Sequence, residues 1–316
     1  MNKRELVEAF FHNEEVDHVP VGLWQHFSAP NDHGKAYVDA QMDYYRKTDL
    51  DFVKISMDGY FGFPNPILKD IEHAETLLQI KPLDRNHPWI QEQIQRAADI
   101  VHEVKGECMT FYTMFCPLSY LRLEVGWDKM MQLMRENPEA MKHACDVIAE
   151  DIQYLAKGIL DAGVDGIFYS VQNAEVTRFT YEEYRSWVTP SDRKVLDYIN
   201  TLSEYNVLHC CGWEPVHNRL EDWKDYPSGA VNWAVYTDDL PIAKAREFFH
   251  RPVWGGFDNG SEGILNRGTK EEIQAETRKL IAEGGKRGYM IGPDCSLCPE
   301  TPIEHIQWVV EQSRQM

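Results

Sequence analysis

Short apolar segments recur along the chain, and each is followed by a turn and by a stretch with hydrophobic residues at helical spacing. Clear helical stretches are Asn137–Leu160, Tyr181–Ser203 and Thr269–Gly284. Two of them start with a residue type that commonly caps a helix N-terminus, Asn137 before a proline and Thr269 before two acids. The apolar segments predicted as strands are Pro20–Phe27, Asp51–Met57, Cys108–Phe115, Asp165–Val171, Asn206–Gly212, Ala230–Tyr236, Pro252–Asp258 and Tyr289–Cys295.

The alternation of strands and helices indicates a parallel sheet, because two parallel strands need a crossover connection between them. Eight strand–helix units in 316 residues correspond to roughly 40 residues per unit, which suits a (β/α)8 barrel with some longer loops. We therefore predict an α/β protein with a single (β/α)8 TIM-barrel domain over residues 1–316. A doubly wound open sheet is the alternative, but no G-x-G-x-x-G or P-loop motif follows any predicted strand.

The formal net charge is −19 at pH 7. Long-range repulsion from this charge argues against nucleic acids and anionic membrane surfaces as partners. It also disfavours a polyanionic substrate, unless a local cluster of arginines overrides the overall field.

The residues at the N-terminus, 1–18, carry acids throughout and contain no uninterrupted apolar run, so they do not resemble a signal peptide. No segment approaches the roughly 18 consecutive apolar residues that a membrane span needs. We therefore expect a soluble, cytoplasmic protein whose seven cysteines are reduced. Reduced cysteines are available for metal binding, catalysis or core packing.

A histidine and a cysteine stand at alternate positions near the end of one predicted strand. Alternate side chains of a strand share a face, so His209 and Cys211 can point together while Cys210 points away. Imidazole and thiolate are ligands that Zn²⁺ prefers, and Cys295 brings another thiol to the same end of the predicted barrel. Three protein ligands with a fourth open position are typical of a catalytic zinc site. The sequence thus predicts one catalytic Zn²⁺ on His209, Cys211 and Cys295.

Core packing is the competing explanation for these cysteines, because free cysteine is among the most frequently buried residue types. The sequence leaves open whether Cys298 or Cys210 also binds the metal. The other three cysteines, Cys108, Cys116 and Cys145, lie in apolar surroundings and are expected in the core.

Several motifs, in their order and spacing over nearly the whole chain, resemble the uroporphyrinogen decarboxylase superfamily. Individually each motif is a weak signal. The motifs are Asp17-His-Val-Pro-Val, Phe115-Cys-Pro-Leu, Glu136-Asn-Pro-Glu, Gly163-Val-Asp-Gly-Ile, Val253-Trp-Gly-Gly-Phe-Asp, Gly292-Pro-Asp-Cys and Pro299-Glu-Thr-Pro-Ile-Glu-His-Ile.

One branch of this superfamily decarboxylates porphyrinogens and carries an arginine-rich R-Q-A-G-R loop after the first strand. In this chain the same place reads Trp24-Gln-His-Phe-Ser-Ala-Pro, without arginine. Because arginine forks are natural partners of carboxylates, their absence makes tetracarboxylate binding difficult. Asp58 does match the acid that faces the pyrrole N–H groups in that branch, and the resemblance therefore implies a catalytic role for it. Cys295 stands where decarboxylases carry a histidine.

A second branch contains zinc-dependent methyltransferases that move a methyl group from a corrinoid protein to a thiol coenzyme. Its ligand pattern, H-x-C on one strand and a single cysteine in a later turn, matches His209, Cys211 and Cys295. The resemblance implies a corrinoid partner or substrate, a thiol acceptor and a homodimer. Asp294 and Ser296 depart from the glycines that this branch favours, which puts the identity of the substrate in doubt.

Four further polar residues follow predicted strands and are candidates for substrate binding: His26, Gln172, Asn173 and Asp258. Asp258 can alternatively order its own loop or orient the ligand histidine. Two other functions remain open. One is decarboxylation of a tetrapyrrole or another carboxylated substrate through Asp58, and the other is non-catalytic binding of a corrinoid or tetrapyrrole.

Overall fold

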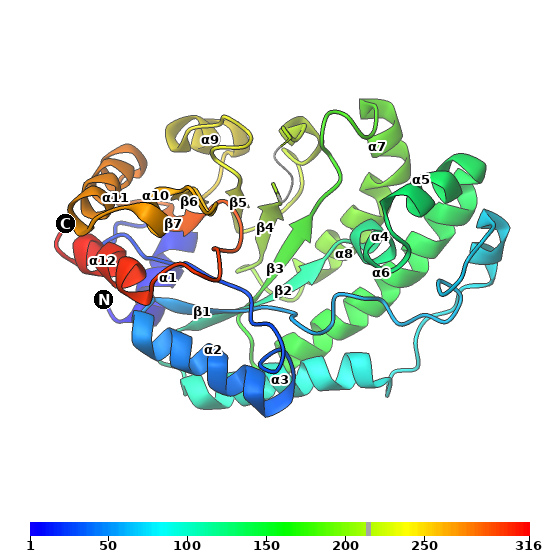
Figure 1. The fold of residues 1–316 in the computed structure, drawn as a ribbon, viewed down its shortest axis with the longest axis horizontal. Coiled ribbons are helices and arrows are strands. Elements are labelled where there is room, and N and C mark those ends of the chain that lie inside the picture. Colours follow the sequence, from blue (N-terminus) through cyan, green and yellow to red (C-terminus); the bar gives the residue numbers. More distant parts are fainter. Residues whose placement is uncertain (213–215) are drawn as a thin grey trace.

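The computed structural model describes residues 1–212 and 216–316. A curled, parallel, seven-stranded sheet forms its centre, and the order of the strands in the sheet follows their order in the chain (Figure 1). Between successive strands the chain returns through helices on the outside of the curled sheet. The strands are β1 (Phe52–Ile55), β2 (Met109–Phe115), β3 (Gly166–Val171), β4 (Val207–Cys210), β5 (Ala230–Trp233), β6 (Val253–Phe257) and β7 (Tyr289–Pro293).

The predicted first strand, Pro20–Phe27, is not a strand of this sheet, so the eight-stranded barrel is only partly confirmed. The segment makes isolated parallel bridges to the β7 side, at Val21–Ile291 and Gln25–Leu297. On the side of β1, the buried carboxylate of Asp51 accepts the N–H of Val21 at 2.8 Å, and the N–H of Asp51 donates to Val21 O at 3.2 Å. Pro20 has no N–H to donate.

The helices begin where the sequence predicts strong caps. Thr269 and Glu272 form a capping box at the start of α11, and the Asn137 side chain accepts the N–H of Ala140 in α6. The α-helices are α1 (Lys3–Phe11), α2 (Gly34–Thr48), α3 (Pro88–Val104), α4 (Pro117–Val125), α5 (Trp127–Glu136), α6 (Pro138–Asp161), α7 (Tyr181–Trp187), α8 (Thr189–Ile199), α9 (Ile242–Phe249), α10 (Ile264–Arg267), α11 (Lys270–Gly284) and α12 (Ile303–Arg314), and the 3-10 helices are η1 (Ala74–Gln79) and η2 (Leu220–Asp222).

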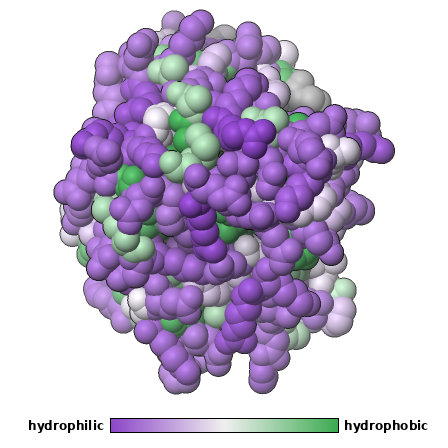
Figure 2. Space-filling view, turned by 90° about the vertical axis from the view of Figure 1, so that its left-hand side faces the viewer, coloured by the Kyte–Doolittle hydropathy of each residue, from purple (hydrophilic) through white to green (hydrophobic). Residues whose placement is uncertain are grey.

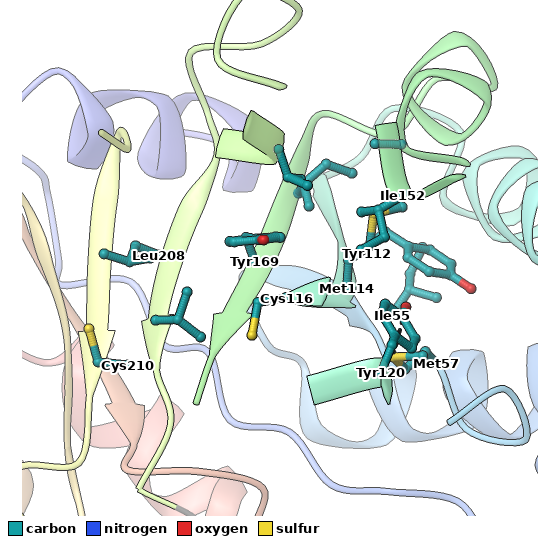
Figure 3. Packing of buried hydrophobic residues seen from close by; sticks show 14 of the residues in the cluster. Ile55, Met57, Tyr112, Met114, Cys116, Tyr120, Ile152, Tyr169, Leu208 and Cys210 are labelled. Atoms are coloured by element: carbon teal, nitrogen blue, oxygen red, sulfur yellow. Dashed lines mark hydrogen bonds between the residues drawn. The ribbon is translucent and has the colours of Figure 1, made fainter. Parts of the chain in front are cut away.

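Two hydrophobic clusters cover the two faces of the sheet. The larger one packs the outward-facing strand residues against the surrounding helices, as Figure 3 shows for Tyr112 next to Ile152 of α6. The smaller cluster fills the inside of the curl with Phe52, Phe111, Phe168, Trp24 and Trp254 together with residues of α1. Helix α1 therefore closes the end of the curl at which the strands begin.

The alternation of side chains along each strand determines the next layer of inward-facing residues, nearer the carboxyl ends of the strands. Inward-facing residues of this layer lie two positions after those of the inner cluster. They are Lys54 after Phe52, Ser170 after Phe168 and His209 after Val207. The layer nearer the carboxyl ends of the strands is consequently polar, and this is the end at which barrel-like α/β proteins carry their functional residues.

The surface is largely hydrophilic on the face shown in Figure 2, with hydrophobic residues in small scattered areas. In the described part of the chain, no helix combines the length and the apolar composition needed to cross a bilayer.

Candidate metal centre

Three side chains of types that commonly bind metal ions meet inside the curl, at the carboxyl ends of two strands. His209 lies on β4, Cys211 follows it, and Cys295 follows β7. The Sγ atoms of Cys211 and Cys295 are 3.9 Å apart, and Cys295 Sγ is 3.8 Å from His209 Nε2. All three ligand atoms lie within 4.8 Å of one another. The three residues that the sequence predicts as a metal site are thus brought together.

The separations between the three ligand atoms suit a tetrahedral ion. Zinc–sulfur bonds of about 2.3 Å and zinc–nitrogen bonds of about 2.0–2.1 Å place two sulfurs about 3.8 Å apart and a sulfur and a nitrogen about 3.6 Å apart. The separations of 3.9 and 3.8 Å are close to these values. Two thiols and an imidazole, converging at these distances, therefore form a donor set that fits zinc.

The imidazole of His209 is held in the tautomer that a metal ligand needs. Its Nδ1 contacts Oδ1 of Asn232, the residue directly opposite on β5. The amide of Asn232 is oriented by two hydrogen bonds from its Nδ2, to Trp254 O at 2.7 Å and Pro293 O at 3.1 Å. Since Asn232 Oδ1 can only accept, Nδ1 of His209 carries the hydrogen and Nε2 keeps its lone pair directed at the two sulfurs.

The local environment also favours a thiolate at Cys295. A hydrogen bond with the Cys211 thiol lowers the pKa of Cys295, and the neighbouring His209 lowers it further, although burial opposes both effects. On the other side of the ligand histidine, the Phe168 ring stacks on the imidazole with a centroid distance of 4.9 Å. The Cys295 thiol is therefore more easily deprotonated, and one face of the His209 ring is covered by Phe168.

The metal-binding atoms open into a cavity of about 240 Å³ with a largely apolar wall. Aromatic side chains of the inner cluster form part of its wall, together with charged and polar side chains. The lining residues are Trp24, His26, Lys54, Phe61, Thr113, Phe115, Arg122, Leu123, Phe168, Ser170, Gln172, His209, Cys211, Cys295 and Ser296. Its size and apolar wall suit a small organic substrate.

Two cationic side chains line this cavity, although the protein as a whole is strongly acidic. Lys54 is only 5% exposed, and its Nζ lies over the rings of Trp24 and Phe168 at 4.7 and 4.6 Å. Burial lowers the pKa of Lys54 to about 8, while the nearby thiols and Asp58 act in the opposite direction. Arg122 is also buried, and burial lowers its pKa from the ordinary value. The cavity therefore contains cationic groups that the net charge of −19 does not indicate.

Gln172, a predicted substrate-binding residue, connects Arg122 to the metal-binding thiols. Its Oε1 accepts a hydrogen bond from Arg122 at 2.6 Å, and its Nε2 donates to Cys211 Sγ at 3.4 Å. The amide thus stabilises negative charge on Cys211 while it lines the cavity.

Of the remaining predicted residues, His26 lines the cavity and the other three do not. Asp58 is buried behind His26, with its Oδ1 2.6 Å from His26 Nδ1. Asn173 is fully buried and donates to Ser119 Oγ. Asp258 accepts the N–H of Gly260 at 2.8 Å and so orders its own loop, which was one of the alternatives for it, while Asn232 contacts His209.

The other cysteines lie outside the cluster of His209, Cys211 and Cys295. Cys210 points to the outer face of the sheet and packs in the larger cluster with Leu208 (Figure 3). Cys298, on the loop after β7, is not among the clustered ligand atoms of the described residues. The remaining three cysteines, Cys108, Cys116 and Cys145, are buried in the larger cluster, as the sequence predicts.

Sequence reasoning missed Lys54, Arg122, Asn232 and Ser296 as members of the site. A signal existed for two of them. Lys54 is the only charged residue in the apolar run of β1, and Asn232 interrupts the apolar run of β5. Both are polar residues on the inward face of a buried strand, which requires a partner or a function. For Arg122 and Ser296 the chain itself offered no comparable signal.

Residues 53–316 match the family model described as uroporphyrinogen decarboxylase (URO-D). The chain belongs to this family. Two kinds of relative occur among curated proteins. A uroporphyrinogen decarboxylase from Carboxydothermus hydrogenoformans is 25% identical over 57% of this chain and 49% of its own length. The methylcobamide:CoM methyltransferase MtbA from Methanosarcina acetivorans is 22% identical over 78% of this chain and 70% of its own length.

Solved structures agree with the fold. A methyltransferase from Methanosarcina mazei superposes with a TM-score of 0.77 and 17% identity, covering 100% of this chain and 99% of its own. A B12-independent methionine synthase from Shewanella has a TM-score of 0.59 at 12% identity, over 94% and 97% of the two chains. At this low identity the similarity concerns the fold alone. The chain is thus an enzyme of the uroporphyrinogen decarboxylase superfamily, with methyltransferases among its relatives.

Proposed function

We propose that this chain is a zinc-dependent methyltransferase that moves a methyl group from a methyl-corrinoid, presented by a partner protein or bound as substrate, to a thiol acceptor. The convergence of Cys211 Sγ, Cys295 Sγ and His209 Nε2 at the wall of an apolar cavity carries this proposal. The MtbA relatives, which are named as methylcobamide:CoM methyltransferases, support it.

A zinc ion on these three residues would offer an open position to a thiol and lower its pKa, so that the acceptor reacts as a thiolate. The residues of the chain prepare that position. Asn232 fixes the lone pair of His209, and Gln172 donates a hydrogen bond to Cys211. The aromatic wall formed by Trp24 and Phe168 makes the surroundings of the site less polar, which strengthens electrostatic interactions there.

Lys54 and Arg122 support an acceptor that carries an acidic group. Both cationic side chains line the cavity close to the sulfur atoms. Because both cations attract negative charge across a largely apolar cavity, an acidic group on the acceptor would bind more strongly than a neutral one.

The same two cations also favour the second candidate function, decarboxylation of a carboxylated substrate. That activity would persist without metal, whereas thiol methylation would not. The two candidates therefore differ in their response to loss of zinc.

The first test is elemental analysis of untagged protein purified without chelator. We expect about one zinc per chain, lost in His209→Ala, Cys211→Ser and Cys295→Ser. Cys298→Ser is the matched control, because this cysteine lies nearby but outside the ligand cluster. Zinc-replete protein should then demethylate methylcobalamin in the presence of coenzyme M. A metal-free wild-type protein, or zinc content unchanged in all three ligand variants, would reject the proposal.

A further inference from the structure

Three side chains at the mouth of the cavity form a continuous hydrogen-bonded chain. The carboxylate of Asp58 accepts the N–H of Phe27 at 2.8 Å through Oδ2, and its Oδ1 is 2.6 Å from His26 Nδ1. On the other side of the ring, His26 Nε2 is 2.8 Å from Ser296 Oγ. The three groups come from three separate segments, before α2, after β1 and after β7.

The neighbouring groups define where the hydrogens lie. The indole Nε1 of Trp24 can only donate, and it donates to Ser296 Oγ at 3.0 Å. A carboxylate only accepts, so Nδ1 of His26 carries a hydrogen directed at Asp58. In the neutral ring, Nε2 therefore accepts the hydroxyl hydrogen of Ser296. The second lone pair of Ser296 Oγ stays available to a group in the cavity.

The chain of groups joins the metal-binding cavity to solvent. Ser296 is the residue after Cys295, and both line the cavity together with His26. The side chain of His26 is 46% exposed, whereas that of Asp58 is only 2% exposed. The ring of His26 therefore lies between the cavity and solvent, with one nitrogen facing Ser296 and the other facing the buried carboxylate of Asp58.

We propose that His26 is the general base that removes the proton of the acceptor thiol, with Ser296 as the relay and Asp58 as a positioning residue. This inference rests on the proposed function. The S–H bond of the acceptor breaks and its electron pair stays on sulfur. Ser296 Oγ takes that proton while its own hydroxyl hydrogen passes to His26 Nε2, leaving an imidazolium paired with Asp58. No oxidant or further reactant is needed.

Binding of coenzyme M to the zinc-replete protein tests the proton transfer directly. Isothermal titration in buffers of different ionisation enthalpy counts the protons released on binding. His26→Gln should release about one proton more per bound thiol than the wild type, because the wild type keeps that proton on the ring. Equal proton counts in the two proteins would overturn the relay.

A spectroscopic readout separates proton transfer from a merely structural role. In protein labelled with ¹⁵N-histidine, the His26 signals, assigned by their loss in His26→Gln, should show one protonated ring nitrogen without ligand and two with coenzyme M. In Asp58→Asn, the thiol should still bind but the ring should stay neutral. Unchanged His26 signals in the wild type on thiol binding would overturn the proposal.

Further outcomes distinguish failure of the relay from failure of the proposed function. Covalent labelling of Ser296 by a fluorophosphonate would identify it as a nucleophile and overturn its role as a relay. If coenzyme M produces no binding heat with zinc-replete protein, the proposed function fails and the relay fails with it. Binding without any difference between wild type and His26→Gln rejects the relay alone.

Discussion

Nδ1 of His209 donates a hydrogen bond to the side-chain oxygen of Asn232, which lies directly opposite on the neighbouring strand. Asn232 in turn donates to two backbone carbonyls, so its amide cannot rotate without losing both bonds. The orientation of the metal-binding imidazole is therefore set by the sheet itself.

Replacing this asparagine should weaken metal binding. In Asn232→Leu the imidazole loses its partner, and we expect zinc affinity to fall about 10–100-fold. Asn232→Asp, which retains an acceptor for Nδ1, should bind zinc more tightly than the leucine variant. Competition with a chromophoric chelator measures the zinc affinities of both variants. Equal affinities in the wild type and Asn232→Leu would show that the contact does not orient the ligand.

Lys54 should reduce the stability of the protein at neutral pH. Its pKa in the folded protein is about 8, below the ordinary 10.5. Between these values the unfolded chain binds more protons, so stability rises with pH through this window, and at pH 7 the full cost of burying the charge is present. Lys54→Met should therefore stabilise the protein by up to about 3 kcal/mol at pH 7.

Urea denaturation at two pH values tests this assignment. The stabilisation by Lys54→Met should be smaller at pH 9.5 than at pH 7, because the wild-type lysine is then largely neutral in the folded state. Lys244→Met, at an exposed position of α9, is the control and should change little. A stabilisation that does not depend on pH would mean that the burial of charge is not its cause.

Gly292 on β7 is required by the close approach of Trp254. A Cβ at this position would lie 2.0 Å from the indole Nε1, which donates to Gly22 O at 3.0 Å. Gly292→Ala should therefore displace the indole from the inner cluster and cost about 1–3 kcal/mol. Thermal unfolding measures the loss, and an unchanged melting temperature would contradict it.

The capping box of α11 should contribute less to the free energy of unfolding than Gly292 does. Thr269 accepts the N–H of Glu272, and Glu272 accepts the N–H of Thr269 in return. We expect Thr269→Ala to cost about 1 kcal/mol, whereas Thr269→Ser should retain most of the stability. The free energy of unfolding from urea titrations distinguishes the two variants.

Local patterns were sufficient for much of the fold. The caps at Asn137 and Thr269 start helices where the residue types predict, because a helix end depends on a few neighbouring residues. The segment at Pro20–Phe27 has the apolar composition of a strand, but it makes only isolated bridges. There the N–H of Val21 is bonded to the carboxylate of Asp51, 30 residues away, and hydropathy carries no information on such a contact.

The sequence by itself indicated the family through the order of its motifs, and it placed His209 and Cys211 on one face, because side chains alternate along a strand whatever surrounds them. Only the tertiary structure decided what those ligands meet. Curling of the sheet brings Asn232 against the imidazole, Lys54 beside the thiols and Ser296 within reach of His26. These relations join residues up to 270 positions apart, so they arise from strand order and packing, which no local pattern encodes.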